Sequence, residues 1–504
     1  MGIARTEYMR EQLGDELLVV MQEIKKTFDP KNVFNPGKIL PDGRHRIDHH
    51  LRNNFVRPIE LPFEPRLAFA FKDRSFIGNL EQCNGCGGCR KDAPMMCPTF
   101  LATGDEVMST RGRANIIRAA LEMRCNRHDP LRSDELDVAL SNCLSCKGCT
   151  PECPSNVNLA LLKAELTYAR HRRDGLPLRE RILSQVDLLG RLGCTMPAVS
   201  NAMLEFRPLR ALLEKTLGLS AKRTLPHYAR ERFDRWFERP KVDATSSRVS
   251  TNQSGWKPLL HSRGKVILWD DTFVRYHEPH IGIAAVKVLE ALGFEVRLPT
   301  GRSCCGWPAF SQGHLDAAAK SGQHNVDLLT RMPGSVPIIF LEPSCYSMFA
   351  EDYRELKIAG AADLSLRCFL FETFVDEQLA AQPTALHFRN GHAAGEPVHV
   401  AIHAHCHAKS LLKPAFMPRL VERLPGHKAT LLETGCCGMA GAFGALASKY
   451  DLSLQVAEPL VRLIKEQPAH SQIVASGTSC RHQIADLTAV HPRHMAELIA
   501  DAID

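Results

Sequence analysis

The sequence predicts a mixed fold, in which a helical, cysteine-rich module precedes a duplicated α/β domain. Two runs of cysteines spaced by two residues begin at Cys83 and Cys143, and a helical pattern separates them. From about residue 256 onward, short apolar runs suited to buried strands alternate with helical stretches. The second half of that region repeats the first half in order. We therefore expect several folded units rather than a single core.

Six parts are expected along the 504 residues. They are a helix with a turn-rich tail, a linker, the cysteine-rich module, a helical connector that ends in a polar linker, and two copies of the α/β domain. Their predicted limits, in that order, are 1–45, 46–75, 76–170, 171–255, 256–375 and 376–504.

The composition is that of an ordinary globular protein, with 44% hydrophobic and 24% charged residues. The net charge of +7 includes no basic block, which disfavours nucleic acid as a partner. No apolar run approaches the length of a membrane span, and the charged start does not fit a signal peptide. We expect a cytoplasmic protein, with peripheral contact to the inner face of the membrane as an alternative. Eighteen cysteines in such a chain indicate metal or redox chemistry rather than disulfides.

The N-terminal part begins with a predicted helix, because Leu17, Leu18, Met21 and Ile24 recur at helical spacing. Proline and glycine after Asp29 then predict turns. The Arg-, His- and Pro-rich stretch that continues to residue 75 has no steady period, and we expect it to lie over a surface as a linker.

The cysteine-rich module contains the most specific motif. The segment from Cys143 to Pro154 reads C-x2-C-x2-C-x3-C-P, in which three thiolates hold one [4Fe–4S] cluster and the fourth reaches a second cluster. The run from Cys83 to Pro98 keeps the first three positions but has seven residues before its Cys-Pro. Between the two runs, RGRANIIRAALEMR predicts a helix with Ile117 and Leu121 on its apolar face.

This spacing predicts a ferredoxin-like 2×[4Fe–4S] module with crossed ligation. The first cluster would take Cys83, Cys86, Cys89 and Cys153, and the second would take Cys143, Cys146, Cys149 and Cys97. Glycines within both runs would let the backbone approach the cluster sulfurs. Paired structural zinc sites are the alternative, but zinc ribbons normally present two separated C-x2-C knuckles rather than triplets with a Cys-Pro. We therefore favour clusters, which would form an electron relay.

The duplicated domain carries a second set of cysteines at the expected ends of its strands. The first copy has Cys304, Cys305 and Cys345, and the second has Cys406, Cys436, Cys437 and Cys480. Thr272 stands in the first copy where the second has Cys406. The second set could hold a metal or cluster, with His403, His405 and His407 as further ligands or proton carriers.

The alternative for these cysteines is that they are small buried residues, which we also favour for the single Cys125, Cys194 and Cys368. The repetition of the cysteines in register favours a redox or binding role for the two sets. Trp307 follows the first cysteine pair and could line a pocket, although a core position is the favoured interpretation.

The two Cys-Pro runs, the segment STRGRANIIRAAL between them and the paired CCG segments resemble the iron–sulfur part of FAD-linked D-2-hydroxyacid oxidoreductases. Similar arrangements belong to the iron–sulfur subunit of glycolate oxidase and to the C subunit of anaerobic glycerol-3-phosphate dehydrogenase. The segment MQEIKKTFDPKNVFNPGKIL resembles the end of the C-terminal FAD-linked oxidase domain of D-lactate and D-2-hydroxyglutarate dehydrogenases. The resemblance implies that residues 1–45 are a remnant of that domain and that the repeats are CCG domains.

The resemblance also implies an electron-transfer role. FAD and the substrate-binding residues would lie on an upstream part or on a partner flavoprotein, and the two clusters would carry electrons from flavin to quinone or another acceptor. In the first repeat, Thr272 replaces the leading cysteine of the family, and Met348 stands where a C-x-x-C partner would fall. The second repeat has Gln483 at that last place, so Cys406, Cys436, Cys437 and Cys480 are the favoured third site.

Two other functions are left open by the sequence. One is a reductase that cleaves a disulfide at the second CCG site, as a resemblance to heterodisulfide reductases would imply. The other is a zinc-stabilised interaction module without redox chemistry.

Overall fold

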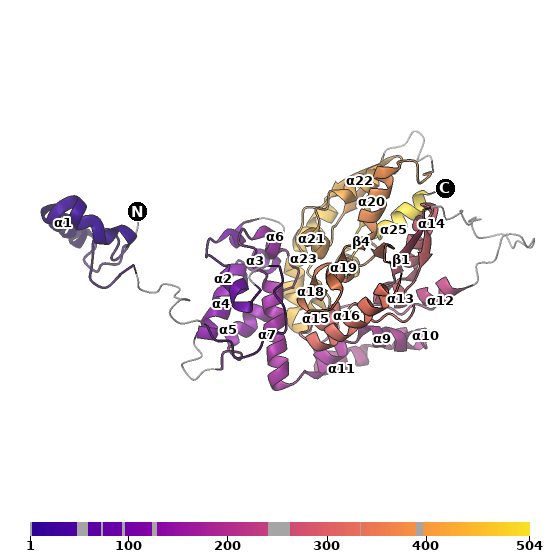
Figure 1. Ribbon diagram of the computed structural model, residues 1–504, viewed down its shortest axis with the longest axis horizontal. Coiled ribbons are helices and arrows are strands. Elements are labelled where there is room, and N and C mark those ends of the chain that lie inside the picture. Colours follow the sequence, from indigo (N-terminus) through magenta and orange to yellow (C-terminus); the bar gives the residue numbers. More distant parts are fainter. Residues whose placement is uncertain are drawn as a thin grey trace, which may run out of the picture. The chain divides into compact units, whose positions relative to one another are not determined.

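The structure is a computed structural model, which describes residues 3–47, 59–71, 74–92, 96–122, 129–239, 263–332, 334–389 and 397–503. The chain forms two compact units, which are residues 1–60 and 61–504. Figure 1 shows the elements of each unit. The predicted polar linker at the end of the connector lies outside the described residues, as does Cys125.

The first unit is a helix closed by a turn-rich tail, as predicted. It contains a 3-10 helix, η1 (Ile3–Tyr8), and the helix α1 (Met9–Phe28), which kinks at Gly14. The Asp29 carboxylate accepts hydrogen bonds from the backbone N–H groups of Val33 and Phe34 at 2.8 and 2.9 Å. Asp29 therefore fixes the turn that follows the helix.

The second unit begins with the cysteine-rich module, which is helical. The helices pack around an apolar interior that includes Ile117 and Leu121, as the sequence pattern predicts. The described elements are α2 (Phe76–Glu81), η2 (Gly88–Arg90), α3 (Pro98–Thr103), η3 (Glu106–Met108), α4 (Thr110–Glu122), α5 (Asp134–Ser141), α6 (Cys149–Glu152) and α7 (Leu159–Asp174).

The residues just before α2 are packed more closely than a surface linker. Leu67 and Phe69 are each only 2% exposed. The backbone N–H of Leu67 donates to Glu165 of α7, and that of Ala70 donates to Glu355 of the first α/β repeat. The segment after residue 60 is therefore an integral part of the second unit, because buried backbone groups need such partners.

The connector is a row of short helices that lies along the edge of the first repeat in Figure 1. Its elements are α8 (Leu178–Leu183), α9 (Val186–Gly193), α10 (Pro197–Glu205), α11 (Arg207–Leu217) and α12 (Phe233–Glu238). Two glycines let α9 approach its neighbours, since a Cβ on Gly190 would lie 2.5 Å from the ring of Tyr276, and one on Gly193 would lie 2.3 Å from Tyr228.

Each α/β repeat is built on a parallel sheet. The first has the strand order β2-β1-β3-β4, formed by β1 (Lys265–Trp269), β2 (Glu295–Arg297), β3 (Ile338–Phe340) and β4 (Cys368–Leu370). The second has the order β6-β5-β7, formed by β5 (Val398–Ile402), β6 (His427–Leu431) and β7 (Gln472–Val474). In both, the first strand is flanked by the second on one side and the third on the other, which confirms the predicted duplication.

Helices cover both sheets and complete the two repeats. In the first they are α13 (Thr272–Tyr276), α14 (Pro279–Ala291), α15 (Trp307–Ser311), α16 (Leu315–Thr330), α17 (Pro343–Ser347), η5 (Met348–Asp352), α18 (Tyr353–Glu355), α19 (Ala361–Ser365) and α20 (Phe371–Ala381). In the second they are α21 (Cys406–Leu411), α22 (Phe416–Glu422), η6 (Phe443–Ala445), η7 (Ala447–Lys449), α23 (Tyr450–Lys465), α24 (Thr478–Leu487) and α25 (Met495–Ala502).

One hydrophobic core joins the two repeats. It contains Leu268 and Ile339 from the first sheet together with Val400 and Ile402 from the second, all at most 1% exposed. The two cysteine pairs, together with Cys345, Cys406 and Cys480, follow the carboxyl ends of strands. Open α/β sheets place ligands at these ends.

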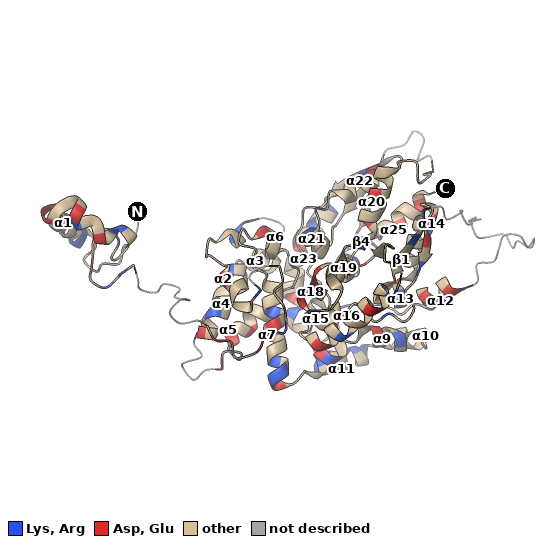
Figure 2. Cartoon of the chain, viewed as in Figure 1, with Lys and Arg blue, Asp and Glu red and all other residues tan. Residues whose placement is uncertain are grey.

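Charged residues of both signs are interspersed over most elements, as Figure 2 shows. A basic cluster occurs in the last turn of α7, which contains His171, Arg172 and Arg173. Among the described residues, no helix has both the length and the apolar character that crossing a bilayer requires.

Candidate iron–sulfur and cysteine sites

The cysteines predicted to hold the second cluster meet around one cavity. Cys97, Cys143, Cys146 and Cys149 all line a small space of about 20 Å³ within the module. Cys97 comes from the other cysteine run, at the start of α3. Four cysteines around one space fit the four thiolates that a [4Fe–4S] cluster takes.

The two cysteine loops share a backbone conformation. Ser145 and Lys147 have positive φ angles of 53° and 60°, and Gly85 and Gly87, at the same places in the first run, have 76° and 73°. A left-handed backbone is unfavourable for serine and lysine, so the second loop is held in this shape by its surroundings. The glycines of the first run adopt the same shape without that cost.

Arg113 of α4 is a buried cation beside the second cysteine set. Its Nη1 donates to the Cys97 sulfur at 2.9 Å, and its Nε donates to the Ala139 carbonyl at 2.7 Å. Burial alone would lower the pKa of Arg113, but the sulfurs of Cys97 and Cys143 raise it above its usual value. Burial likewise opposes ionisation of Cys97, yet Arg113 brings the pKa of this thiol below its usual value. The arginine thus favours a thiolate at the predicted ligand.

The cysteines of the first run lie close to the segment that carries Cys153. A Cβ on Gly88 would lie 3.5 Å from the Cys86 sulfur and 3.6 Å from Pro154, which directly follows Cys153. The backbone N–H groups of Gly88 and Arg111 donate to Cys86 and Cys89 at 3.4 and 3.3 Å. Such N–H···S bonds are the second-sphere contacts that cluster ligands need.

The second cysteine loop is fastened to both α/β repeats. Lys147, only 3% exposed, donates to Asp352 at 2.8 Å and to Ser347 at 2.8 Å in the first repeat. The Ser145 carbonyl lies 3.2 Å from Nε2 of His407 in the second repeat. The loop that would hold the second cluster is therefore in direct contact with the α/β domains.

The second repeat gathers its four cysteines in one buried group. Cys406, Cys436, Cys437 and Cys480 belong to the same packed cluster as Cys146 of the module. The ligand atoms of His403, Cys437 and Cys480 all lie within 4.8 Å of one another. The Nδ1 of His403 is hydrogen bonded to Thr434 at 2.8 Å, whereas its buried Nε2 has no partner in the described part of the chain. An unpartnered imidazole nitrogen beside two thiols fits a metal or cluster ligand.

The electrostatics of this group also fit metal-binding thiolates. Hydrogen bonds from the thiols of Cys436 and Cys480 hold the pKa of Cys437 well below its usual value, with a further contribution from His403. A hydrogen bond from Cys436 lowers the pKa of Cys406 to about 7, against the effect of burial. Thiolates, rather than thiols, are the forms that bind metals.

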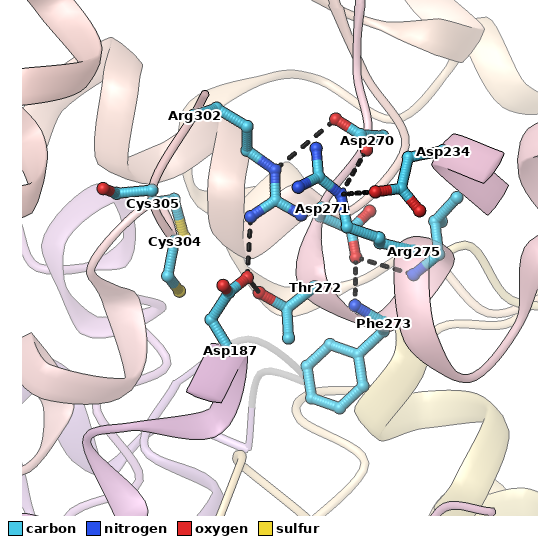
Figure 3. Close-up of polar contacts among 12 residues, drawn as sticks. Asp187, Asp234, Asp270, Asp271, Thr272, Phe273, Arg275, Arg302, Cys304 and Cys305 are labelled. Carbon is cyan, nitrogen blue, oxygen red and sulfur yellow. Dashed lines mark hydrogen bonds and ion pairs between the residues drawn. The ribbon is translucent and has the colours of Figure 1, made fainter. Parts of the chain in front are cut away.

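The first repeat replaces this arrangement with a polar network (Figure 3). Thr272, at the place of Cys406, donates to Asp187 of α9 at 3.0 Å. Arg302 pairs with the same Asp187 at 2.7 Å and stacks over Trp269, which stands where the second repeat has His403. The repeat therefore lacks both the cysteine and the histidine of the second site.

The three cysteines of the first repeat remain close to one another. The Cys345 thiol donates to the Cys305 sulfur at 3.1 Å, and Figure 3 shows Cys304 next to Cys305 near Arg302. The hydrogen bond with Cys305 lowers the pKa of Cys345, but burial and the nearby Asp271 and Cys304 outweigh it and raise this pKa to about 12. Neutral thiols are poor metal ligands. This agrees with the prediction that a third metal or cluster site lies in the second repeat rather than the first.

A cavity of about 460 Å³ connects the module with the second repeat. It is lined by Cys143 and Lys163 on one side and by Cys406, Cys436 and Cys437 on the other. Trp307 also lines this cavity, where its ring makes an edge contact with His407 at 4.4 Å between ring centres. Trp307 is therefore a cavity residue and not the core residue that the sequence favoured.

Arg113 and Lys147 are site residues that sequence reasoning missed. Each is a buried cation next to predicted ligands, and no local pattern separates them from surface cations. The sequence contained one indication for Lys147, because this residue lies inside the cysteine motif at a position where the first run has glycine. Cys194 and Cys368 are buried away from these groups, as the sequence predicts for structural thiols.

Three protein families match parts of the chain. The C-terminal domain of FAD linked oxidases matches residues 1–39, and a 4Fe-4S dicluster domain matches residues 79–157. A cysteine-rich domain, CCG, matches twice, at residues 272–350 and 400–485. The dicluster match implies two [4Fe–4S] clusters.

Curated relatives agree with this organisation. D-2-hydroxyglutarate dehydrogenase of Escherichia coli is 26% identical over 99% of this chain, and the match covers 50% of that protein. The C subunit of anaerobic glycerol-3-phosphate dehydrogenase from the same species is 28% identical, over 69% of this chain and 83% of its own length. The glycolate oxidase iron-sulfur subunit of that species is 25% identical, over 84% of this chain and 94% of its own length.

The chain spans about half the length of the D-2-hydroxyglutarate dehydrogenases that it matches. It is homologous to all three relatives. The matched domains occur in the order that the sequence motifs predict. The chain therefore combines the C-terminal part of an FAD-linked oxidase domain with a 4Fe-4S dicluster domain and two CCG domains, in that order.

Proposed function

We propose that this chain is the iron–sulfur electron-transfer part of an FAD-dependent D-2-hydroxyacid dehydrogenase, with D-lactate, D-2-hydroxyglutarate or glycolate as the substrate class. It would receive electrons from flavin on an upstream part or a partner flavoprotein and deliver them to quinone or another acceptor. The observation that carries the proposal is that Cys146, in the second cysteine loop, belongs to the same buried cluster as Cys406 in the second CCG repeat.

This proximity supports a continuous route for electrons from the cysteine-rich module to the second CCG repeat. [4Fe–4S] clusters, when bound, pass single electrons, whereas oxidation of a hydroxyacid to a ketoacid releases two electrons and two protons. The residues of this chain would hold the two clusters, with Cys83, Cys86, Cys89 and Cys153 around one and Cys97, Cys143, Cys146 and Cys149 around the other. Lys147 and the Ser145 carbonyl keep the second loop against the CCG repeats.

The surface of the first unit supports a flavoprotein partner. Large apolar side chains are exposed over α1 and the following turn, including Val20, Ile24, Phe28 and Phe34. Contiguous exposed apolar residues of this size are typical of an interface rather than of a free surface. Because this unit matches the FAD-linked oxidase domain, the flavin-bearing part of such an enzyme is the proposed partner.

A second candidate is a reductase that acts at the second CCG site on a disulfide substrate. The cavity of about 460 Å³ favours it, because that space reaches Cys406, Cys436 and Cys437 and is large enough for a small substrate. Alanine at Cys436 and Cys437 separates the two functions. Only the reductase predicts lost disulfide reduction while the dicluster module keeps its iron.

The test of the proposed function is metal analysis followed by reduction. Anaerobically purified protein should contain about eight iron atoms and eight sulfides in the dicluster module, and dithionite should produce EPR signals of interacting clusters. A flavoprotein partner supplied with the hydroxyacid should reduce the same clusters. Zinc without sulfide would contradict the proposal and favour an interaction module, and clusters that no flavoprotein partner reduces would also contradict it.

A further inference from the structure

A second cavity lies between the connector helices and the CCG repeats. Its volume is about 300 Å³, within the range of small-molecule sites. Most of its lining is apolar, with Val186, Leu189 and Leu204 from the connector, Phe273 and Trp307 from the first repeat, and Met439 from the second. The lining suits an apolar ligand with an aromatic body.

A single buried carboxyl oxygen in this cavity has no partner. Asp271 is 2% exposed, and its Oδ1 accepts hydrogen bonds from the N–H groups of Phe273 and Val274, which caps α13. Its Oδ2 is buried and unpartnered within the described residues (Figure 3). A buried oxygen of this kind is available for a hydrogen bond with a ligand.

The charges around the cavity disfavour an anionic ligand. The carboxyl groups of Asp271 and Glu342 both line it and act on one another electrostatically. Burial, with a further contribution from Glu342, raises the pKa of Asp271 to about 7, so this acid readily carries a proton and can donate. Arg223 is the one lysine or arginine among the described lining residues, and its guanidinium already donates to Ser453 and the Gly444 carbonyl. A neutral ligand with a hydrogen-bond acceptor is therefore favoured over a carboxylate.

The cavity is next to the proposed electron route. Trp307 lines both this cavity and the larger one beside the second CCG site. The Trp307 ring contacts His407, which is hydrogen bonded to the Ser145 carbonyl in the second cysteine loop. A ligand in the cavity would thus be separated from that loop by few side chains.

The connector helices that line the cavity also expose apolar side chains to solvent. The helices α9, α10 and α11 expose Leu192, Met196, Met203, Phe206 and Leu212, each more than half exposed. These helices lie along one edge of the second unit in Figure 1. An apolar molecule dissolved in a membrane could pass from such a surface into the cavity.

We propose that this cavity binds the ring of a quinone, with Asp271 hydrogen bonded to one of its carbonyl oxygens. This site rests on the proposed function, since it would be the place where the electrons leave the chain. The quinone takes two electrons, one at a time, from the reduced iron–sulfur clusters and two protons from the surrounding water, and it leaves as the hydroquinone. The hydroxyacid bound by the partner flavoprotein is the source of both electrons.

The test is a binding measurement with menadione, a soluble naphthoquinone, on the anaerobically purified full chain. Leu189→Trp should fill the cavity and raise the dissociation constant at least about tenfold, whereas Leu188→Trp, at the neighbouring position, which does not line the cavity, should leave it within about twofold. Asp271→Ser keeps a capping residue for α13 but removes the free oxygen. It should also weaken binding about tenfold. D-lactate should not displace menadione.

A second readout uses dithionite-reduced protein, in which the oxidation of the clusters is followed by absorbance. Leu189→Trp should slow oxidation by menadione but not oxidation by ferricyanide, with iron content unchanged. Equal menadione binding in Leu189→Trp and the original protein would overturn the site, as would displacement by D-lactate. Reduction of the clusters by the flavoprotein is measured without quinone, so a failure of that step contradicts the proposed function and is distinct from a failure of this site.

Discussion

At the scale of single residues, the assignment of cysteines to clusters is the most specific expectation. The shared cavity places Cys97 with Cys143, Cys146 and Cys149, although Cys97 follows Cys89 in sequence. The Cys-Pro motif predicts the same crossing, because its fourth cysteine points away from the first three. The ligand sets themselves stay a proposal until they are tested by substitution.

We predict that Cys97→Ser and Cys149→Ser perturb the same EPR signal, while Cys89→Ser and Cys153→Ser perturb the other. Each change removes a ligand of one cluster and leaves about four iron atoms in the other. Cys194→Ser is the matched control, because Cys194 is buried and belongs to neither set. If Cys97→Ser instead changed the signal that depends on Cys89, the crossed assignment would be wrong.

Lys147 provides a second residue-scale expectation. It is buried with Asp352, and Glu351 lies 3.1 Å from the same ammonium group. Lys147→Met leaves a buried carboxylate without its partner, so the free energy of unfolding should fall by about 3 kcal/mol. The double variant Lys147→Met/Asp352→Asn should recover most of this loss. Thermal unfolding of the three proteins measures the effect, and a double variant as unstable as the single one would show that the unpaired charge is not the cause.

At the scale of elements, the connector helices depend on glycine for close packing. A Cβ at Gly190 would lie 2.5 Å from the ring of Tyr276 and 3.1 Å from its Cβ, and Tyr276 is 2% exposed. The clash therefore involves the root of a buried side chain, which cannot move aside easily.

We predict that Gly190→Ala lowers stability by about 1–3 kcal/mol through overpacking. Helix propensity alone would give the opposite result, because alanine is better than glycine in a helix by about 1 kcal/mol. Leu188→Ala, at an exposed position of the same helix, is the control and should change stability by less than about 0.5 kcal/mol. A melting temperature that rises in Gly190→Ala would contradict the packing seen here.

The exposed apolar side chains of α9–α11 lead us to expect that these helices contact a membrane surface. Arg191 and Arg207 are exposed on the same helices, an arrangement typical of helices that lie on anionic membranes. We predict that the protein sediments with vesicles containing phosphatidylglycerol and that Leu192→Glu/Met203→Glu reduces the bound fraction severalfold. The control variant is Leu366→Glu, an exposed leucine of the first repeat. Equal sedimentation of both variants would argue against this surface as the contact.

At the scale of the whole molecule, the division at residue 60 predicts two independent units. The second unit contains the module, the connector and both repeats, with its own hydrophobic cores. We predict that a protein of residues 61–504 keeps the iron content and melting temperature of the full chain. The same protein should lose electron transfer from the flavoprotein if the apolar surface of the first unit is the contact. Loss of iron on truncation would contradict the independence of the units.

Much of this organisation could be predicted from the sequence because it depends on local patterns. Ligand spacing within Cys143–Pro154, the helix between the cysteine runs and the strand-then-cysteine order of each repeat are all local properties. Alignment of the two CCG segments also shows that Thr272 of the first repeat occupies the position of Cys406 in the second. The limits of the six predicted parts stay predictions.

The tertiary structure determined which distant residues lie next to these local motifs. Only folding brings Lys147 to Asp352, 205 residues away, and His407 to Ser145, 262 residues away. Arg113, Trp307 and Asp271 owe their environments to burial against distant elements, which lowers the local dielectric and leaves specific atoms paired or free. The sequence therefore determined which groups could bind clusters, whereas the packing of remote segments determined the cavities, the charges around them and the contact between the module and the repeats.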